Sequence, residues 1–172
     1  MAAGTEADRA LSILGGRKVL PRIRPNRQST PRRSKRGAAQ PNETAYGLEP
    51  GEVKWVELIR AGLPSQSLAR AAEALSLSVN DLSRRLRLPP RTVYRRVQKR
   101  DRLTQEESER SVRVARSLAR AQQILGDEEG RRWLLDGSRA LGGEVPLSLL
   151  DTADGFTAVM DELGRLEHGV IS

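Results

Sequence analysis

The chain has 172 residues, of which 37% are hydrophobic and 3% aromatic, so its core must be built from Leu, Val, Ile and Ala, which favours helices. The absence of Cys and the presence of a single His exclude disulfide frameworks, thiolate zinc sites and His-based catalytic triads. The formal net charge of +8 favours an anionic partner, and no apolar run approaches the ~20 residues of a membrane span. We expect an all-α protein without catalytic residues, metal or cofactor. Because it also lacks a secretory signal, we expect it in the cytoplasm.

The charge is distributed unevenly along the chain. Residues 1–43 contain ten basic and three acidic residues, and residues 84–102 contain nine basic and one acidic residue. Residues 126–172 reverse this balance, with four basic and ten acidic residues. Clustered positive charge is typical of nucleic-acid binding, although a solvated surface gives the same counts. The sequence therefore predicts a cationic front part and an anionic C-terminal part.

The first 46 residues are predicted to form a basic, largely flexible region. A short helix can form over residues 7–14, and Gly15-Gly16 would end it. Residues 25–46 are mostly Pro, Arg, Ser, Gln and Asn, with almost nothing to bury, which is typical of a linker. This linker could lie along DNA phosphates or remain a solvated tail.

Two helices and a helix-turn-helix pattern are predicted next. Helices are expected over about residues 51–60 and from Ser65 to Leu75, where apolar residues recur at helical spacing. Ser78 can cap a short helix that Pro89-Pro90 ends, and Pro90 suits the first position of the following helix. A short amphipathic helix, a turn and a helix with a cationic outer face form the helix-turn-helix pattern.

The second helix of this pair is the expected recognition helix, because the major groove of DNA admits one helix. Val93 and Val97 form its inward seam. The side chains expected to contact DNA lie on its outer face: Arg91, Thr92, Tyr94, Arg95, Arg96, Lys99 and Arg100. The arginines at positions 84, 85 and 87 can contact the DNA backbone or stay solvated. Since one such unit contacts too little DNA for strong specificity, we expect a homodimer that reads two half-sites.

A long helix is predicted to tie the two halves together. Thr104 and Glu107 form a capping box before a helix over residues 105–125. Gly126 would break this helix, and Asp127 would cap the next one, which contains Trp133. Glycines and a proline then predict turns, and Thr152 can cap a last helix over residues 153–166.

The C-terminal part carries a set of short motifs in a fixed order: Trp133-Leu134, Ala140-Leu141-Gly142-Gly143, Val145-Pro146-Leu147, Leu149-Leu150-Asp151-Thr152, Gly155, and Gly164 to Val170. Together they resemble the toxin-binding domain of Xre-type antitoxins, the Xre/MbcA/ParS family. Residues 59–64, 91–96, 103–104 and 107–108 are similar to the N-terminal module of that family. The resemblance covers about Val53 to the end. We therefore divide the chain into residues 1–46, an Xre-like helix-turn-helix domain over residues 47–125, and a toxin-binding domain over residues 126–172.

The resemblance implies an antitoxin of a type II toxin–antitoxin system, whose partner is a RES-domain toxin that consumes NAD. Such an antitoxin binds and blocks the toxin, and it represses the shared operon by binding double-stranded operator DNA at the bacterial nucleoid. The residues implied on the toxin-binding side are Trp133, Arg139, Gly142, Gly143, Arg165, Glu167, His168, Gly169 and Val170. For Trp133, the surrounding apolar triplet favours a core position over an interface anchor.

Two other functions fit the same pattern. The chain can be a stand-alone helix-turn-helix regulator whose C-terminal domain dimerises or binds a small effector. It can also be an interaction adaptor that kept the fold and lost DNA binding, which the Arg-rich recognition helix argues against. A toxic neighbouring gene product would favour the antitoxin.

Overall fold

The computed structural model describes residues 5–16 and 50–169, so the predicted linker and Val170 lie outside the described residues. Within these ranges all regular structure is helical, and the predicted all-α class is confirmed. The elements are α1 (Glu6–Ile13), α3 (Pro50–Ala61), α4 (Ser65–Ala74), α5 (Val79–Arg85), α6 (Pro90–Lys99), α7 (Gln105–Leu125), α8 (Asp127–Leu135), the 3-10 helix η1 (Arg139–Leu141), α9 (Pro146–Leu149) and α10 (Ala153–Glu167).

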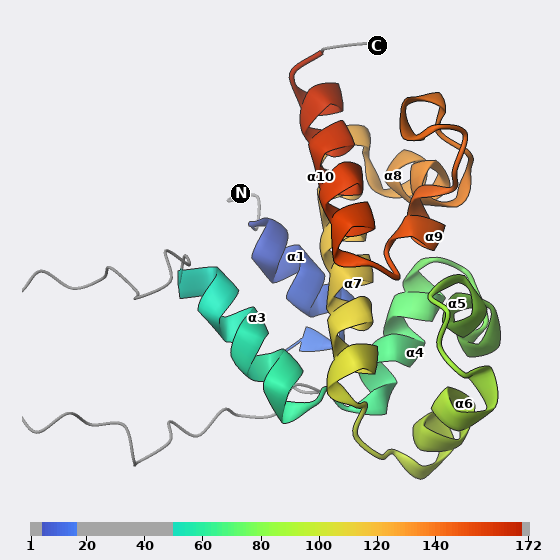
Figure 1. The fold of residues 1–172 in the computed structure, drawn as a ribbon. Helices are drawn as coiled ribbons and strands as arrows, with labels where there is room; N and C mark the ends of the chain where they lie inside the picture. The colour runs from blue at the N-terminus through green and yellow to red at the C-terminus, as the bar shows by residue number, and fades with distance from the viewer. Residues whose placement is uncertain (1–4, 17–49, 170–172) are drawn as a thin grey trace, which may run out of the picture.

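Helix α7 is the axis of the fold, and α1, α3, α4, α8 and α10 all pack against it (Figure 1). Its start is fixed by the predicted capping box. The hydroxyl of Thr104 accepts a hydrogen bond from the Glu107 amide at 3.2 Å, and the Glu107 carboxylate accepts one from the Thr104 amide at 2.7 Å. Val114 and Leu118 of α7 are fully buried, as their spacing predicts. This helix therefore positions both halves of the chain.

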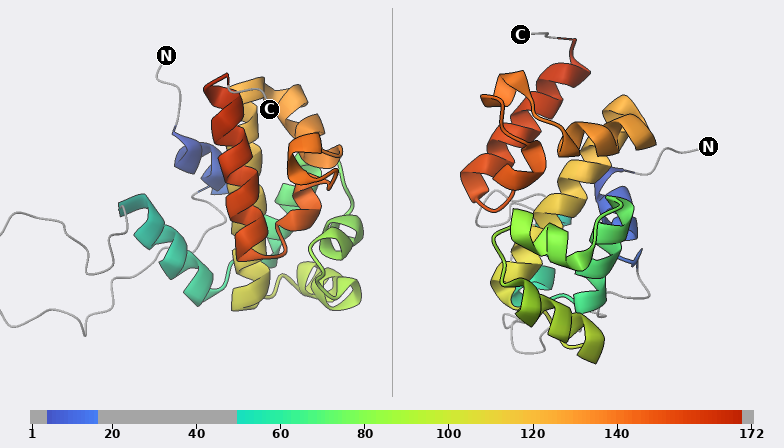
Figure 2. Two further views of the ribbon diagram at one scale, coloured as in Figure 1. Left: turned by 45° about the horizontal axis from the view of Figure 1, so that its top comes forward. Right: turned by 90° about the vertical axis from the view of Figure 1, so that its right-hand side faces the viewer.

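The helix-turn-helix unit forms as predicted. Ser78 caps α5 by accepting a hydrogen bond from the Asp81 amide at 3.0 Å, and Pro90 is the first residue of α6. A four-residue turn, residues 86–89, separates α5 from α6. Both helices pack against α4 at one end of the molecule (Figure 2).

The C-terminal elements pack along the rest of α7. Helix α8 crosses α7 at Gly130, where an added Cβ would lie 2.5 Å from the backbone nitrogen of Gln122, so the crossing requires glycine. Thr152 caps α10 as predicted, because its hydroxyl accepts a hydrogen bond from the Gly155 amide at 3.0 Å. Helix α10 then runs beside α7 in the same direction (Figure 1). Its buried residues are Val159, Glu162 and Leu163.

Near the N-terminus, the short helix predicted over residues 7–14 forms as α1, and it packs on α7 and α4 with Ala10 and Leu14 fully buried. One local prediction was wrong. Asp127 does not cap α8. The cap is Gly126, at φ 92°, and Asp127 is the first helical residue. At this position its carboxylate interacts favourably with the positive end of the helix dipole. The carboxylate also lies 3.6 Å from the guanidinium of Arg9 in α1.

One hydrophobic core runs through the whole described structure. It includes Leu14, Leu63 and Val93 at one end and Leu134 and Leu163 towards the other, all fully buried. The predicted boundary between residues 125 and 126 falls at the turn between α7 and α8, but the buried side chains continue across it. The two halves are thus two functional regions on a shared core.

Candidate functional site

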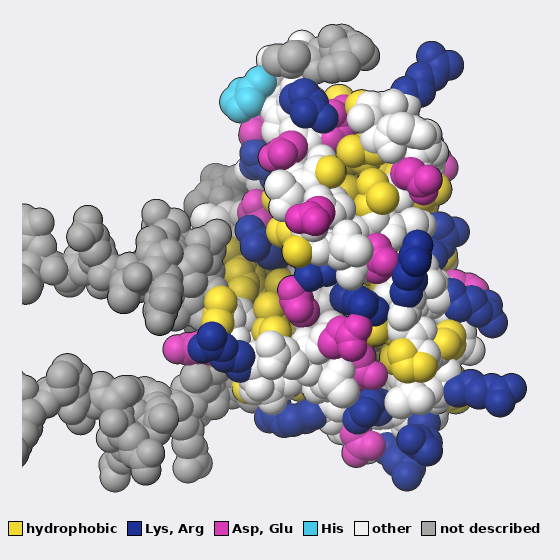
Figure 3. Space-filling model, viewed as in Figure 1, with side chains coloured by type: hydrophobic (Ala, Val, Ile, Leu, Met, Phe, Trp, Pro, Cys, Tyr) yellow, Lys and Arg dark blue, Asp and Glu magenta, His cyan; other side chains and the backbone are white. Residues whose placement is uncertain are grey.

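The outer face of α6 is cationic and open. Val93 is buried, whereas Arg91, Tyr94, Arg95, Lys99 and Arg100 are exposed, Tyr94 by 48%. Figure 3 shows Lys and Arg side chains gathered over the lower right of the molecule, where α5 and α6 lie. Across the part of the chain that the structure describes, the three exposed cations of α6 and Arg100 at its C-cap form no ion pair. Their charges therefore remain available to an external anion.

Thr92 and Gln98 complete the description of this face. Thr92 is half-buried near the start of α6. Gln98 is exposed and lies three residues after Arg95 and seven after Arg91, on the same face of the helix. Its amide can donate and accept hydrogen bonds, as base edges require. The prediction missed Gln98, although helical spacing alone would have found it.

Arg96, in contrast, lies in an internal ion pair. Its Nε lies 3.4 Å from Oε2 of Glu107, whose side chain is 5% exposed, and its own side chain is 31% exposed. Nη1 of Arg96 donates to the carbonyl of Arg102 at 3.4 Å. The structure therefore places Arg96 between α6 and the start of α7, apart from the open cations.

The C-terminal end of α6 is fixed by further contacts with α4. The hydroxyl of Ser65 donates to the carbonyl of Arg96 at 3.0 Å, and the amide of Gln66 donates to the carbonyl of Val97 at 2.9 Å. The same two carbonyls also accept hydrogen bonds from the backbone amides of Asp101 and Arg100, so each is bonded twice. The exposed face of α6 is thus held at a set angle by α4 and α7.

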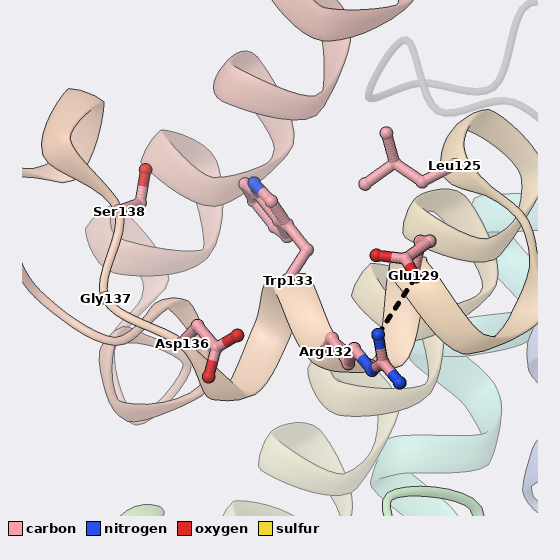
Figure 4. A pocket seen from close by; sticks show the side chains of 7 residues that line it. All are labelled: Leu125, Glu129, Arg132, Trp133, Asp136, Gly137 and Ser138. Atoms are coloured by element: carbon pink, nitrogen blue, oxygen red, sulfur yellow. Dashed lines mark hydrogen bonds and ion pairs between the residues drawn. The ribbon is translucent and has the colours of Figure 1, made fainter.

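A second candidate surface surrounds Trp133, far from α6 along α7. A hollow of about 710 Å³ opens between the end of α7, α8 and the segment before η1. Figure 4 shows the Trp133 indole between Leu125 and Ser138, with Glu129 and Asp136 also lining the hollow. Trp133 is half-buried and packs against the core, so it is partly in the predicted core position and partly open to a partner.

The rim of this hollow is mostly anionic. Arg132 lies in ion pairs with Glu128 and Glu129, at 3.4 and 3.2 Å. A hydrogen bond from Arg131 lowers the pKa of the neighbouring Glu128 carboxyl, and burial acts in the opposite sense. The Asp136 carboxylate forms no ion pair within the described residues. A partner that carries positive charge beside an apolar group would therefore match this rim.

Arg139, Gly142 and Gly143 belong to one exposed turn. The amide of Gly143 donates to the carbonyl of Ser138 at 2.8 Å, which closes the turn around η1. Gly142 and Gly143 have φ values of 71° and 85°, in the region that favours glycine. The predicted role of the glycines in a turn is therefore confirmed, while Arg139 projects from that turn without a described ion-pair partner.

The remaining predicted toxin-side residues lie at the end of α10. Arg165 pairs with the buried Glu162, and Glu167 pairs with Arg120 of α7. His168 and Gly169 are exposed where α10 ends. These last residues and the η1 turn lie towards the same end of the molecule, opposite α6 (Figure 1).

Comparison with known proteins relates these two surfaces to two known domains. Residues 54–116 match the antitoxin Xre-like helix-turn-helix domain, and residues 120–169 match the antitoxin Xre/MbcA/ParS C-terminal toxin-binding domain. An Antitoxin Xre of Yersinia enterocolitica is 37% identical over 99 residues, which are 56% of this chain and 67% of the relative. The chain belongs to the Xre family of antitoxins.

Two further relatives are more distant. An Antitoxin Xre of Photorhabdus laumondii is 28% identical over 117 residues, covering 67% of this antitoxin and 79% of the relative. A Prs ADP-ribosylating antitoxin of a Sphingobium species is 26% identical over 127 residues, covering 68% of this antitoxin and 80% of the relative. The family resemblance inferred from short motifs is thus confirmed.

The two matched domains divide the antitoxin within α7. The helix-turn-helix match ends at residue 116 and the toxin-binding match begins at residue 120, so α7 contributes to both. The open cations of α6 lie in the first domain, and the Trp133 hollow lies in the second. The protein is therefore an antitoxin of a toxin–antitoxin system, with a DNA-binding and a toxin-binding domain.

The acidic side chains of the described residues are dispersed. Within residues 5–16 and 50–169, no group of three or more His, Cys, Asp or Glu side chains could hold a metal ion. No described helix is both long and apolar enough to cross a membrane.

Proposed function

We propose that this antitoxin binds and blocks a RES-type toxin that degrades NAD, and that it represses its own operon by binding operator DNA. The observation that carries this proposal is the separation of two open surfaces along α7, the cationic face of α6 and the region around Trp133 and the end of α10. One relative has ADP-ribosylation in its name, and ADP-ribosyl groups come from NAD. This supports an NAD-consuming partner.

On the DNA side, we assign base reading to Arg91, Thr92, Tyr94, Arg95 and Gln98, and phosphate contacts to Lys99 and Arg100. Arginine matches the acceptor pair of guanine, and Gln matches the donor and acceptor of adenine. Phosphate contacts set register without reading sequence. We expect a homodimer, because two α6 helices are needed to read two half-sites one helical turn apart.

On the toxin side, Trp133 is the proposed anchor. A half-buried Trp beside a preformed hollow has the features of an interface hot spot, since it offers a large apolar area at little ordering cost. The η1 turn with Arg139, Gly142 and Gly143 and the chain end with Arg165, Glu167 and His168 to Val170 complete the proposed surface. The anionic balance of this half disfavours DNA and favours a protein partner.

The test is co-expression with the gene product encoded beside it. We expect the neighbour alone to arrest growth and consume NAD, and the antitoxin to co-purify with it and suppress both effects. Deleting residues 168–172 should release toxin activity while binding to the promoter duplex of the operon is retained. A neighbour that is harmless alone would refute the RES-type partner, and unchanged neutralisation by the truncated chain would refute the role of the C-terminus.

A further inference from the structure

Two arginines of α7, three residues apart, each bind a turn, and the two turns belong to different halves of the antitoxin. Nη1 of Arg110 donates to the carbonyl oxygens of residues 86 and 87, in the helix-turn-helix turn, at 2.9 and 3.2 Å. One helical turn further on, Nη1 of Arg113 donates to the carbonyl oxygens of residues 150 and 151, between α9 and α10, at 3.3 and 3.0 Å. Both arginine side chains are largely buried, with 17% and 11% exposed. The two turns are therefore neighbours on one face of α7.

An ion pair joins the two turns directly. Nε of Arg87 lies 3.0 Å from Oδ2 of Asp151, whose side chain is 13% exposed. Arg87 has a φ of 51°, a left-handed conformation that glycine adopts freely and that is unfavourable for arginine. The backbone position alone would therefore favour glycine. What arginine adds at this position is a guanidinium that reaches Asp151.

The turn that Arg87 occupies sets the start of α6. The amides of Thr92 and Val93 both donate to the carbonyl of Pro89 at 3.1 Å, so the first turn of α6 is built on residues 86–89. The other end of α6 is held independently, by α4 and by Glu107. A shift of the helix-turn-helix turn would thus tilt α6 about its fixed end and displace Arg91 first.

We propose that Asp151, a residue of the toxin-binding domain, is a positioning residue for the DNA-binding face. It holds the helix-turn-helix turn through Arg87, while Arg113 holds Asp151 itself in place. The proposal rests on the proposed function in one respect, that α6 contacts DNA. Because coupling between sites is reciprocal, a protein partner that engages Asp151 would change the affinity for DNA, and DNA would change the affinity for that partner by the same factor.

The test compares Asp151→Asn with Asp154→Asn in the full-length antitoxin. Asp154 is exposed in the first turn of α10 and forms no ion pair within the described residues, so its variant removes the same charge without breaking the junction. Removing an acidic charge should by itself strengthen binding to polyanionic DNA. Positioning predicts the opposite sign for Asp151→Asn, a loss of roughly two- to fivefold in affinity, in the range of partly exposed ion pairs.

Affinity is measured by fluorescence anisotropy with a duplex from upstream of the antitoxin's own gene and with a scrambled duplex of the same length. Asp151→Glu should recover most of the lost affinity. Arg87→Gln should lose a similar factor, and the double variant Arg87→Gln with Asp151→Asn should lose little more, because both changes break one pair. If Asp151→Asn binds as well as Asp154→Asn or better, the proposal is overturned.

Hydrogen exchange separates this proposal from the proposed function. We expect the amides of residues 86–88 and 91–93 to exchange faster in Asp151→Asn than in Asp154→Asn or the wild type, and this measurement needs no DNA. If the wild type fails to bind the upstream duplex, operator binding is refuted, and faster exchange in Asp151→Asn still supports the junction. Equal exchange rates in the two variants overturn it.

Discussion

The guanidinium of Arg96 lies 3.4 Å from the carboxylate of Glu107, which is almost fully buried at the start of α7. Glu107 also accepts the hydrogen bond from the Thr104 amide that closes the capping box. One carboxylate therefore fixes both the start of α7 and the end of α6. Arg96 is therefore partly buried in this contact, whereas the side chain of the preceding residue, Arg95, is exposed.

The first prediction concerns the salt dependence of DNA binding. The logarithm of the affinity falls as the logarithm of the salt concentration rises. Arg95→Gln should make the slope of this fall less steep by about 1, because one contact between a cation and the DNA is lost. Arg96→Gln should weaken binding and leave that slope unchanged, because Arg96 acts through the orientation of α6. Binding titrations over a range of salt concentrations measure both. An equal fall of the slope in the two variants would contradict an internal role for Arg96.

The second prediction concerns the crossing of α7 and α8. Gly130→Ala should lower the free energy of unfolding by at least about 2 kcal/mol, because the new methyl group would overlap the backbone of α7 and overpacking of this kind costs about 1–3 kcal/mol or more. Gly164→Ala is the matched control. It also replaces a helical glycine, but no atom lies within 4 Å of the added Cβ, so it should stabilise the chain by roughly 0.5–1 kcal/mol. Urea denaturation measures both changes, and equal effects would refute the close crossing.

The third prediction concerns cooperativity. The chain has two tryptophans, and they lie in different halves, Trp55 in α3 and Trp133 in α8. Because one core joins these halves, the fluorescence of Trp133→Phe and of Trp55→Phe should each follow a single transition that coincides with the loss of helical circular dichroism in the same variant. Resolved transitions for the two reporters would mean that the halves unfold separately.

The fourth prediction concerns a substitution in the shared hydrophobic core. Leu134→Ala in α8 should lower the stability of the whole described fold by about 2–5 kcal/mol, because Leu134 is fully buried. Both tryptophan signals should shift to lower denaturant together. Gln123→Ala, at an exposed position of α7, is the control and should change stability by less than about 0.5 kcal/mol. If only the Trp133 signal shifted, the core would not be shared.

The fifth prediction concerns the hollow on the toxin-binding domain. Trp133→Ala should weaken toxin binding by about 2 kcal/mol or more, the range of interface hot spots, while affinity for the upstream duplex changes little. Co-purification and calorimetry with the toxin measure the first effect, and anisotropy measures the second. Because Trp133 also packs on the core, Trp133→Phe is the second variant; it should keep the fold and retain part of the affinity. Full toxin affinity in both variants would refute the anchor.

Local features were predictable from the sequence because they depend on short-range chemistry. Caps at Ser78, Thr104 and Thr152 and the start of α6 at Pro90 all follow from hydrogen-bonding groups or fixed dihedral angles within a few residues. The length of α7 follows in the same way, because Thr104 caps its start and Gly126 ends it.

Long-range relationships could not be predicted from these patterns. The ion pair of Arg96 with Glu107 depends on where α7 begins relative to α6. Sequence spacing alone cannot distinguish Arg95 from Arg96 as a residue that faces DNA. The pair of Arg87 and Asp151 joins residues 64 positions apart, and the burial of α1 depends on a surface formed by α7 and α4. These contacts are decided by tertiary packing, which composition and periodicity do not encode residue by residue.

The burial of α1 changes the topology of the cationic segment that follows it. Residues 17–49 contain nine Lys and Arg against two acidic residues, and they connect α1 to α3, both of which pack on α7. The two helices that flank this segment in the sequence therefore belong to one folded body. A single proteolytic cut within residues 17–49 would leave α1 bound to the protein as a non-covalent peptide. The two fragments would elute together under native conditions and separate only in denaturant.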